Sequence, residues 1–160
     1  MFESRERLTE EVKGLLDAFR ALGEGRYACI LEPKGLLFES AEPEDDGEWM
    51  LRRFLEQRTG ALFRIPAALA SGEEMEDLFA DWEGDAFFLA FINGRVGLVV
   101  ACPDPEPLKA RAERPLRALA DRLLRLNPAW RLDEKGRGLF IGRARLDMVV
   151  VGRPDEAEAG

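Results

Sequence analysis

The sequence is built around one unit that occurs twice: two short apolar stretches on either side of a tight turn, followed by a segment with helical spacing. The first copy covers Tyr27–Ser40 and then Trp49–Gln57, and the second covers Phe87–Ala101 and then Leu108–Leu126. Two hairpins that are each followed by a helix can bury their apolar faces as one curved antiparallel sheet packed against helices. The sequence therefore predicts an α+β domain.

The second hairpin has the clearest local signal in the chain. Asn93-Gly94 separates the β-prone runs Phe87–Ile92 and Arg95–Ala101, and Asn-Gly is the pair that best tolerates the positive φ angles of a type I′ turn. Nearly every residue in both runs is apolar, so we expect this hairpin to be central and covered on both faces. The first hairpin turns at Pro33-Lys34-Gly35, where proline fixes φ and glycine supplies a left-handed position.

Three helices are expected around the sheet. Ser4 is a suitable N-cap for a first helix that ends at Gly23, a second helix ends near Gly60, and a third spans Leu108–Leu126 with a kink or restart at Pro115. The expected apolar sides are Leu8, Val12, Leu15, Leu16, Phe19 and Leu22 in the first, Trp49, Met50, Leu51, Phe54 and Leu55 in the second, and Leu108, Ala112, Leu116, Leu119, Leu123 and Leu126 in the third.

The segments between these elements are less clear. Ala61–Pro66 fits either an edge strand or a buried connection, and Ser71 followed by Glu74 resembles a capping box in front of a stripe formed by Met75, Leu78, Phe79 and Trp82. Gly138–Gly142 and Leu146–Val151 fit two strands or one strand bent at Gly142. We expect about five antiparallel strands in the order α-β-β-α-(α)-β-β-α-β, one domain over residues 1–154, and a disordered acidic tail over residues 155–160.

The net charge of −8 disfavours nucleic acid and anionic membrane as partners, because counterion release needs a dominant basic face. One local exception is the series Lys109, Arg111, Arg114, Arg117, Arg122 and Arg125, which we interpret as the solvated side of an amphipathic helix in preference to a binding patch. The chain contains no apolar run of the roughly 18 to 20 residues that a membrane span needs, and its start lacks the order of a secretory signal. We expect a cytoplasmic protein.

The absence of histidine excludes Ser/His/Asp and Cys/His triads and histidine metal ligands. Cys29 and Cys102 alone cannot form a structural zinc site; a disulfide requires their strands to be neighbours, and we favour buried free thiols. Carboxylate pairs such as Glu42 with Asp45, or Asp81 with Asp85, are best interpreted as surface groups in a chain with 31 acidic residues. We therefore expect no catalytic residue, no metal and no cofactor, and a protein that is not an enzyme.

Trp49, Trp82 and Trp130 could line a pocket, although tryptophan at helical spacing is more often a core or interface anchor. Trp49 is the best interface candidate because it follows an acidic loop near the start of its helix. Arg114 and Arg117 are the corresponding candidates on the last helix. The sequence thus offers three candidate residues for contact with a protein partner.

The order of these elements, the turn in Leu31–Leu37 and the hairpin Asn93–Val100 together resemble the roadblock / dynein light chain family of profilin-like domains over residues 4–126. The segment Gly60–Gly84 is longer than is usual in that family, and the β segment after Asn127 is additional. The late strand is closer to a GAF-like or PAS-like sensor domain.

The roadblock resemblance implies a non-catalytic homodimer that binds or regulates a Ras-like small GTPase, or that scaffolds a larger assembly. The GAF-like interpretation implies instead a small-molecule sensor with a hollow next to residues such as Ala90 or Ala101. A third alternative is a protein similar to secretion chaperones, which are small acidic α+β dimers that hold an unfolded client.

Overall fold

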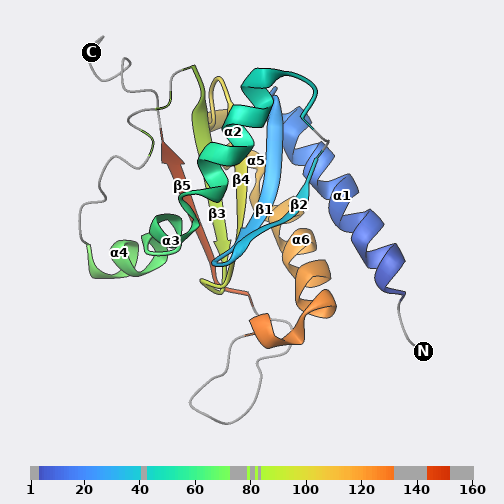
Figure 1. Ribbon diagram of the computed structural model, residues 1–160. Coiled ribbons are helices and arrows are strands. Elements are labelled where there is room, and N and C mark those ends of the chain that lie inside the picture. Colours follow the sequence, from blue (N-terminus) through green and yellow to red (C-terminus); the bar gives the residue numbers. More distant parts are fainter. Residues whose placement is uncertain are drawn as a thin grey trace.

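The computed structural model describes residues 4–40, 43–72, 79, 82, 84–131 and 144–151 of this 160-residue chain. Within these residues the chain forms a five-stranded sheet in the order β2-β1-β4-β3-β5, and every neighbouring pair is antiparallel. Helices cover both faces of the sheet (Figure 1). The predicted α+β class, number of strands and order of elements are confirmed.

The strands follow the two predicted hairpins and the late β segment: β1 Tyr27–Glu32, β2 Gly35–Glu39, β3 Ala86–Ile92, β4 Val96–Cys102 and β5 Leu146–Val151. The helices are α1 Arg5–Leu22, α2 Asp46–Glu56, α3 Thr59–Leu62, α4 Ile65–Ser71, α5 Glu106–Arg111 and α6 Glu113–Leu126, followed by the short 3₁₀ helix η1 Pro128–Trp130.

The β3–β4 hairpin is the centre of the molecule. Every residue of both strands is buried, and the hairpin has neighbours on both sides, because β4 also pairs with β1 and β3 also pairs with β5. A strand covered on both faces can be apolar at every position, which is why these two runs do not alternate. The predicted central position of this hairpin is confirmed.

Each face of the sheet has its own hydrophobic core. On one face, residues such as Ile30, Phe88 and Leu98 pack under α1, α5 and α6. On the other face, residues such as Leu31 and Leu89 pack under α2, α3 and α4. The chain is therefore a three-layer arrangement in which the sheet separates two groups of helices (Figure 1).

Several local signals act as the sequence predicts. The Ser4 hydroxyl accepts a hydrogen bond from the Arg7 amide at the start of α1, as an N-cap does. The long last helix is interrupted at Ala112, so that α6 starts two residues before Pro115. A proline in the first turn of a helix needs no amide hydrogen there, so Pro115 marks the predicted restart.

In the segment between the hairpins, the structure decides one open alternative and corrects one prediction. Ala61–Pro66 is not an edge strand; it is a connection that contributes to the two short helices α3 and α4, with Leu62 and Ile65 buried. Ser71 does not begin a helix, since it ends α4 and its hydroxyl donates a hydrogen bond to the Ala68 carbonyl. Gly72 then adopts a left-handed conformation with φ 73°, which closes the helix.

Some expectations fall outside the described residues and remain predictions. These are the capping residue Glu74 with Met75 and Leu78, the strand over Gly138–Gly142 and the disordered tail over 155–160. The single domain over residues 1–154 likewise remains a prediction.

The Asn93 side chain forms hydrogen bonds that join two later segments of the chain to the central β3–β4 hairpin. Both turn residues have the positive φ angles predicted for a type I′ turn, 54° for Asn93 and 66° for Gly94. The Asn93 side chain accepts a hydrogen bond from the Arg145 amide at 2.7 Å and donates one to the Trp130 carbonyl at 3.1 Å. The turn therefore holds the residue before β5 and the end of η1 in addition to reversing the chain.

Cys29 and Cys102 are free thiols, as expected. Their strands β1 and β4 are neighbours, but Cys29 belongs to the core under α2 and Cys102 to the core under α1. Burial is the main cause that raises the pKa of both thiols, to about 11 for Cys102, where the carboxylates Asp85 and Asp104 contribute further. Both side chains are therefore in the neutral form at neutral pH and behave as apolar core groups.

We predict that Asn93→Gly lowers the free energy of unfolding by about 1–3 kcal/mol, because glycine keeps the turn geometry but loses both side-chain hydrogen bonds. Asn93→Ala should lose roughly 1–2 kcal/mol more, because alanine also disfavours the positive φ angle. Urea unfolding measures both values. Equal stability of Asn93→Gly and the parent protein would show that the side-chain bonds contribute nothing.

Alkaline pH should destabilise the fold through Cys102. The unfolded chain loses the thiol proton near pH 9.0, whereas the folded chain holds it until about 11, so stability is complete below pH 9.0 and is lost as the pH rises between these values. This thiol alone contributes a slope of roughly 1.4 kcal/mol per pH unit. Urea unfolding from pH 8 to 11 should therefore show a shallower slope for Cys102→Ala than for the parent, and identical slopes would refute the assignment.

Candidate protein-interaction surface

Helix α2 lies on the sheet face opposite α1 and α6 (Figure 1). It begins after Asp45, whose carboxylate accepts a hydrogen bond from the Glu48 amide at 2.8 Å. Its buried side consists of Leu51, Phe54 and Leu55, which pack on the core residues of that face. Asp45 thus has a structural role as the cap of α2. Glu42 and Asp81 lie outside the described residues, so the interpretation of the Glu42–Asp45 and Asp81–Asp85 pairs remains a prediction.

Trp49 and Met50 face outward on α2, with exposed fractions of 51% and 64%. The prediction that both belong to the buried apolar side of the helix is wrong, because Leu51, Phe54 and Leu55 alone fill that side. The other large hydrophobic side chains that are exposed in the described part of the chain, Leu22, Leu37 and Leu69, are less exposed, at 37–42%. The candidate residue Trp49 therefore forms, with Met50, the most exposed apolar pair described.

The Arg52 guanidinium supports the exposed Trp49 ring. Its central carbon lies 5.3 Å from the centre of the ring, a cation–π contact. On its other side, Arg52 Nε lies 3.5 Å from a carboxylate oxygen of Glu39 and 3.6 Å from one of Glu56. An arginine that is held by two carboxylates limits the freedom of the indole that rests on it.

Glu39 and Tyr27 fix this support to the sheet. The Tyr27 hydroxyl donates a 2.7 Å hydrogen bond to Glu39, so β1 and β2 both contribute to the cluster. Burial raises the pKa of Tyr27, with smaller contributions from Cys29 and from the bond to Glu39, and the hydroxyl keeps its proton. Tyr27, Glu39, Arg52 and Trp49 thus form a continuous series of contacts from the core to the surface.

Trp82 and Trp130 are placed differently from Trp49. The Trp82 ring packs 4.9 Å from the Phe54 ring, and its indole N–H donates to Asp85, which is also paired with Arg26 at 2.7 Å. The Trp130 side chain is only partly buried against the core under α1. These two tryptophans therefore serve packing, and Asp85 is engaged in a structural cluster.

Arg114 and Arg117 lie on α6, on the sheet face opposite Trp49. Both are exposed, and Arg117 Nη2 lies 3.6 Å from a carboxylate oxygen of Glu113. The structure does not bring the three candidate residues into one surface. Any contact made through these arginines is separate from one made through Trp49.

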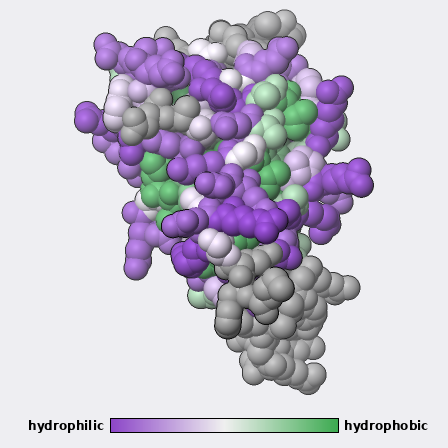
Figure 2. Space-filling view, turned by 90° about the vertical axis from the view of Figure 1, so that its right-hand side faces the viewer, coloured by the Kyte–Doolittle hydropathy of each residue, from purple (hydrophilic) through white to green (hydrophobic). Residues whose placement is uncertain are grey.

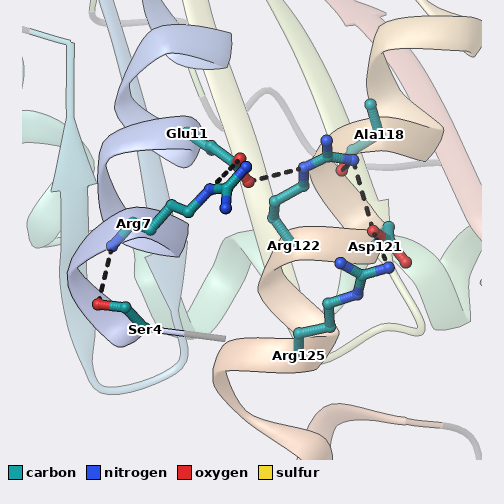
Figure 3. A network of polar contacts seen from close by, with 7 residues as sticks. All are labelled: Ser4, Arg7, Glu11, Ala118, Asp121, Arg122 and Arg125. Atoms are coloured by element: carbon teal, nitrogen blue, oxygen red, sulfur yellow. Dashed lines mark hydrogen bonds and ion pairs between the residues drawn. The ribbon is translucent and has the colours of Figure 1, made fainter. Parts of the chain in front are cut away.

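Arg122 joins α6 to α1 through Glu11. Figure 3 shows Glu11 of α1 between Arg7 and Arg122, at 3.5 and 3.3 Å. Arg122 also contacts Asp121 at 3.4 Å, and Arg125 contacts the same carboxylate at 3.2 Å. A network of partly exposed charges joins the two helices. For Arg122, this supports the interpretation as part of a solvated helix side in preference to a binding patch.

The side of the molecule that carries α1 is mostly hydrophilic. Figure 2 looks onto this side and shows hydrophilic side chains over most of it, with separate hydrophobic areas between them.

On the neighbouring edge strand β2, the register with β1 shifts between Ile30 and Leu31, which leaves Leu37 without a partner. A bulge of this kind twists an edge strand and opposes pairing with another sheet.

The positions named for a sensor pocket lie on opposite faces of the sheet. Ala90 belongs to the core under α1 and Ala101 to the core under α2, and both are fully buried. One ligand between sheet and helices could not contact both.

Among the described residues, no three His, Cys, Asp or Glu side chains are placed to hold a metal ion. None of the helices in the described ranges has the length and hydropathy to cross a membrane.

Comparison with known proteins gives a structural likeness but no match in sequence. No family model matches the sequence, and no curated protein matches it. The structure is similar to Myxococcus xanthus MglB, with 12% sequence identity and a TM-score of 0.49, over 84% of this chain and 98% of that chain. A likeness at this level transfers no activity to this chain.

We predict that Arg52→Met lowers the free energy of unfolding by roughly 1–3 kcal/mol, because Glu39, whose side chain is only 16% exposed, loses its cation. The matched control is Arg53→Met, which removes the same charge from an exposed position on the same helix and should change stability by less than about 0.5 kcal/mol. Equal effects of the two substitutions in thermal and urea unfolding would contradict the role given to Arg52.

Proposed function

We propose that this protein is a non-catalytic interaction domain that binds a protein partner through the exposed side of α2. The observation that carries the proposal is the exposure of Trp49 and Met50, 51% and 64%, on a helix that already has a complete buried side. Tryptophan and methionine are enriched where proteins bind one another. Exposing two such side chains to water does not stabilise a monomer.

The contacts beneath Trp49 support this assignment. An indole that rests on Arg52, with Arg52 held by Glu39 and Glu56, loses little conformational freedom when a partner covers it. Exposed charges such as Asp46 and Arg53 lie on the same helix, which is the arrangement of an apolar centre with a polar rim. The Trp49 side chain is therefore held in position before a partner binds.

A non-catalytic role is supported by what the described polar groups do. Asp45 caps α2, Asp85 is shared by Arg26 and Trp82, and Glu39 is shared by Tyr27 and Arg52. These carboxylates act as structural partners, and the chain contains no histidine to act as a base near neutral pH.

We further propose that the protein works as a homodimer joined through β5. This strand pairs with β3 in regular register over its length, and among the described residues its other edge has no strand partner. The opposite edge strand β2 carries the bulge at Leu37 and is less suited to pairing. Two β5 strands that pair about a two-fold axis would extend the sheet and leave both α2 surfaces uncovered.

The partner that we propose is a Ras-like small GTPase. The basis for this choice is the roadblock resemblance of the two hairpins and the closing helix, which implies a regulator or scaffold for such GTPases. The α2 surface provides the place on this chain where that contact would be made.

We predict that Trp49→Ala weakens binding to its partner by at least about tenfold, since a buried interface tryptophan contributes 2 kcal/mol or more. The test measures binding of Ras-like GTPases from the same organism, loaded with GDP or a GTP analogue, by titration calorimetry. Leu69→Ala, which removes another exposed apolar side chain, is the matched control and should bind like the parent protein.

The melting temperature of Trp49→Ala should stay within a few degrees of the parent value, because half of the side chain is already in water. Equal binding by the parent and Trp49→Ala would contradict the α2 surface. Binding by none of the GTPases in either nucleotide state would contradict the named partner.

A further inference from the structure

The junction between α5 and α6 concentrates positive charge in a chain whose net charge is −8. Residues 109–117 contain four cations and one carboxylate: Lys109, Arg111, Arg114 and Arg117, and Glu113. All five of these residues are exposed. A local surplus of positive charge therefore faces solvent on the sheet face opposite Trp49.

Three of the arginines lie along one side of the helices. Ala112, between α5 and α6, has helical backbone angles, φ −79° and ψ −26°, so α6 continues the path of α5. Arg111, Arg114 and Arg117 follow one another at intervals of three residues, a spacing that makes side chains neighbours on a helix. At the rise of an α-helix they span about 9 Å. We call them the arginine stripe.

The stripe has few partners within the chain. The Arg111 and Arg114 side chains make no hydrogen bond or ion pair with any described residue. Arg117 pairs with Glu113 at 3.6 Å, and both side chains are well exposed, so another carboxylate can replace Glu113. In contrast, Arg122 contacts Glu11 of α1 (Figure 3). Like charges at this spacing repel one another, so the stripe does not stabilise the isolated chain.

Apolar side chains lie close to the stripe. Ala110 is exposed and precedes Arg114 by four residues, which places it on the same side of the helices. Leu22, 37% exposed, ends α1. The next residue, Gly23, lies so close to α5 that a Cβ atom there would be 3.2 Å from Leu108. The surface beside the junction thus combines guanidinium groups with exposed apolar groups.

We propose that the arginine stripe, together with Leu22, binds an acidic amphipathic segment of another protein. Carboxylates complement the charge of the stripe, and the planar guanidinium group forms paired hydrogen bonds with them. Exposed ion pairs alone contribute little, so the segment must also present apolar side chains to Leu22 and Ala110. This proposal does not depend on the α2 surface.

Nucleic acid fits this surface less well. Duplex DNA carries about one charge per 1.7 Å of its axis, so its charge continues well beyond a stripe of about 9 Å. The remainder of such a polyanion would meet the field of a chain with a net charge of −8. A short acidic segment can confine its charge to the stripe.

The test is fluorescence anisotropy with a labelled helical peptide of about fourteen residues, with glutamate on one side and leucine on the other. The glutamate peptide should bind at least about tenfold more tightly than the same peptide with glutamine, and its affinity should fall between about 20 and 300 mM salt. Equal affinity of the two peptides, or no binding of the glutamate peptide, would overturn the proposal. Tighter binding of a single-stranded oligonucleotide of equal charge, or of phosphatidylserine vesicles, would overturn the assignment to a protein segment.

Charge-matched variants separate the stripe from the field of the whole protein. Arg114→Glu and Arg111→Glu should each weaken binding of the glutamate peptide by at least about tenfold, because they place like charges opposite each other. Arg64→Glu makes the same change of charge at an exposed position beside α4, on the other face of the sheet, and should weaken binding by less than about twofold. Circular dichroism spectra and melting curves show that each variant is folded. Equal weakening by all three substitutions would overturn the proposal.

Discussion

The structure depends on a hairpin that is buried from every direction. Strands β3 and β4 have helices on both faces and strands on both edges, and the positive φ angles of Asn93 and Gly94 fix their register. The same turn holds the chain before β5 and after α6 through the Asn93 side chain. The two cores and the helices that cover them are positioned by packing on this hairpin.

The fold is largely predictable from the sequence because its main elements have local causes. The Asn-Gly pair, the restart at Pro115 and the cap at Ser4 each act within a few residues of themselves. The sequence of Ala61–Pro66 leaves strand and connection open because a short apolar run lacks a period that distinguishes strand from helix. The pattern assigns Trp49 and Met50 to the apolar side of their helix because consecutive apolar residues widen the predicted stripe, whereas both side chains are exposed.

The candidate sites were predictable only in part, because their geometry depends on contacts between distant segments. Trp49 could be proposed from its own position, but its support by Arg52 and Glu39 joins α2 to β2. Arg114 and Arg117 could likewise be named as candidates, whereas their position on the sheet face opposite Trp49 depends on how α6 packs. Periodicity identifies an exposed residue without identifying its neighbours.

We propose that the protein acts by association, as a homodimer with an exposed α2 surface. The most direct measurement is native mass spectrometry of the purified protein over a dilution series. We predict a mass of two chains, without added ligand mass, that persists at low concentration. A mass of one chain at every concentration would contradict the claim.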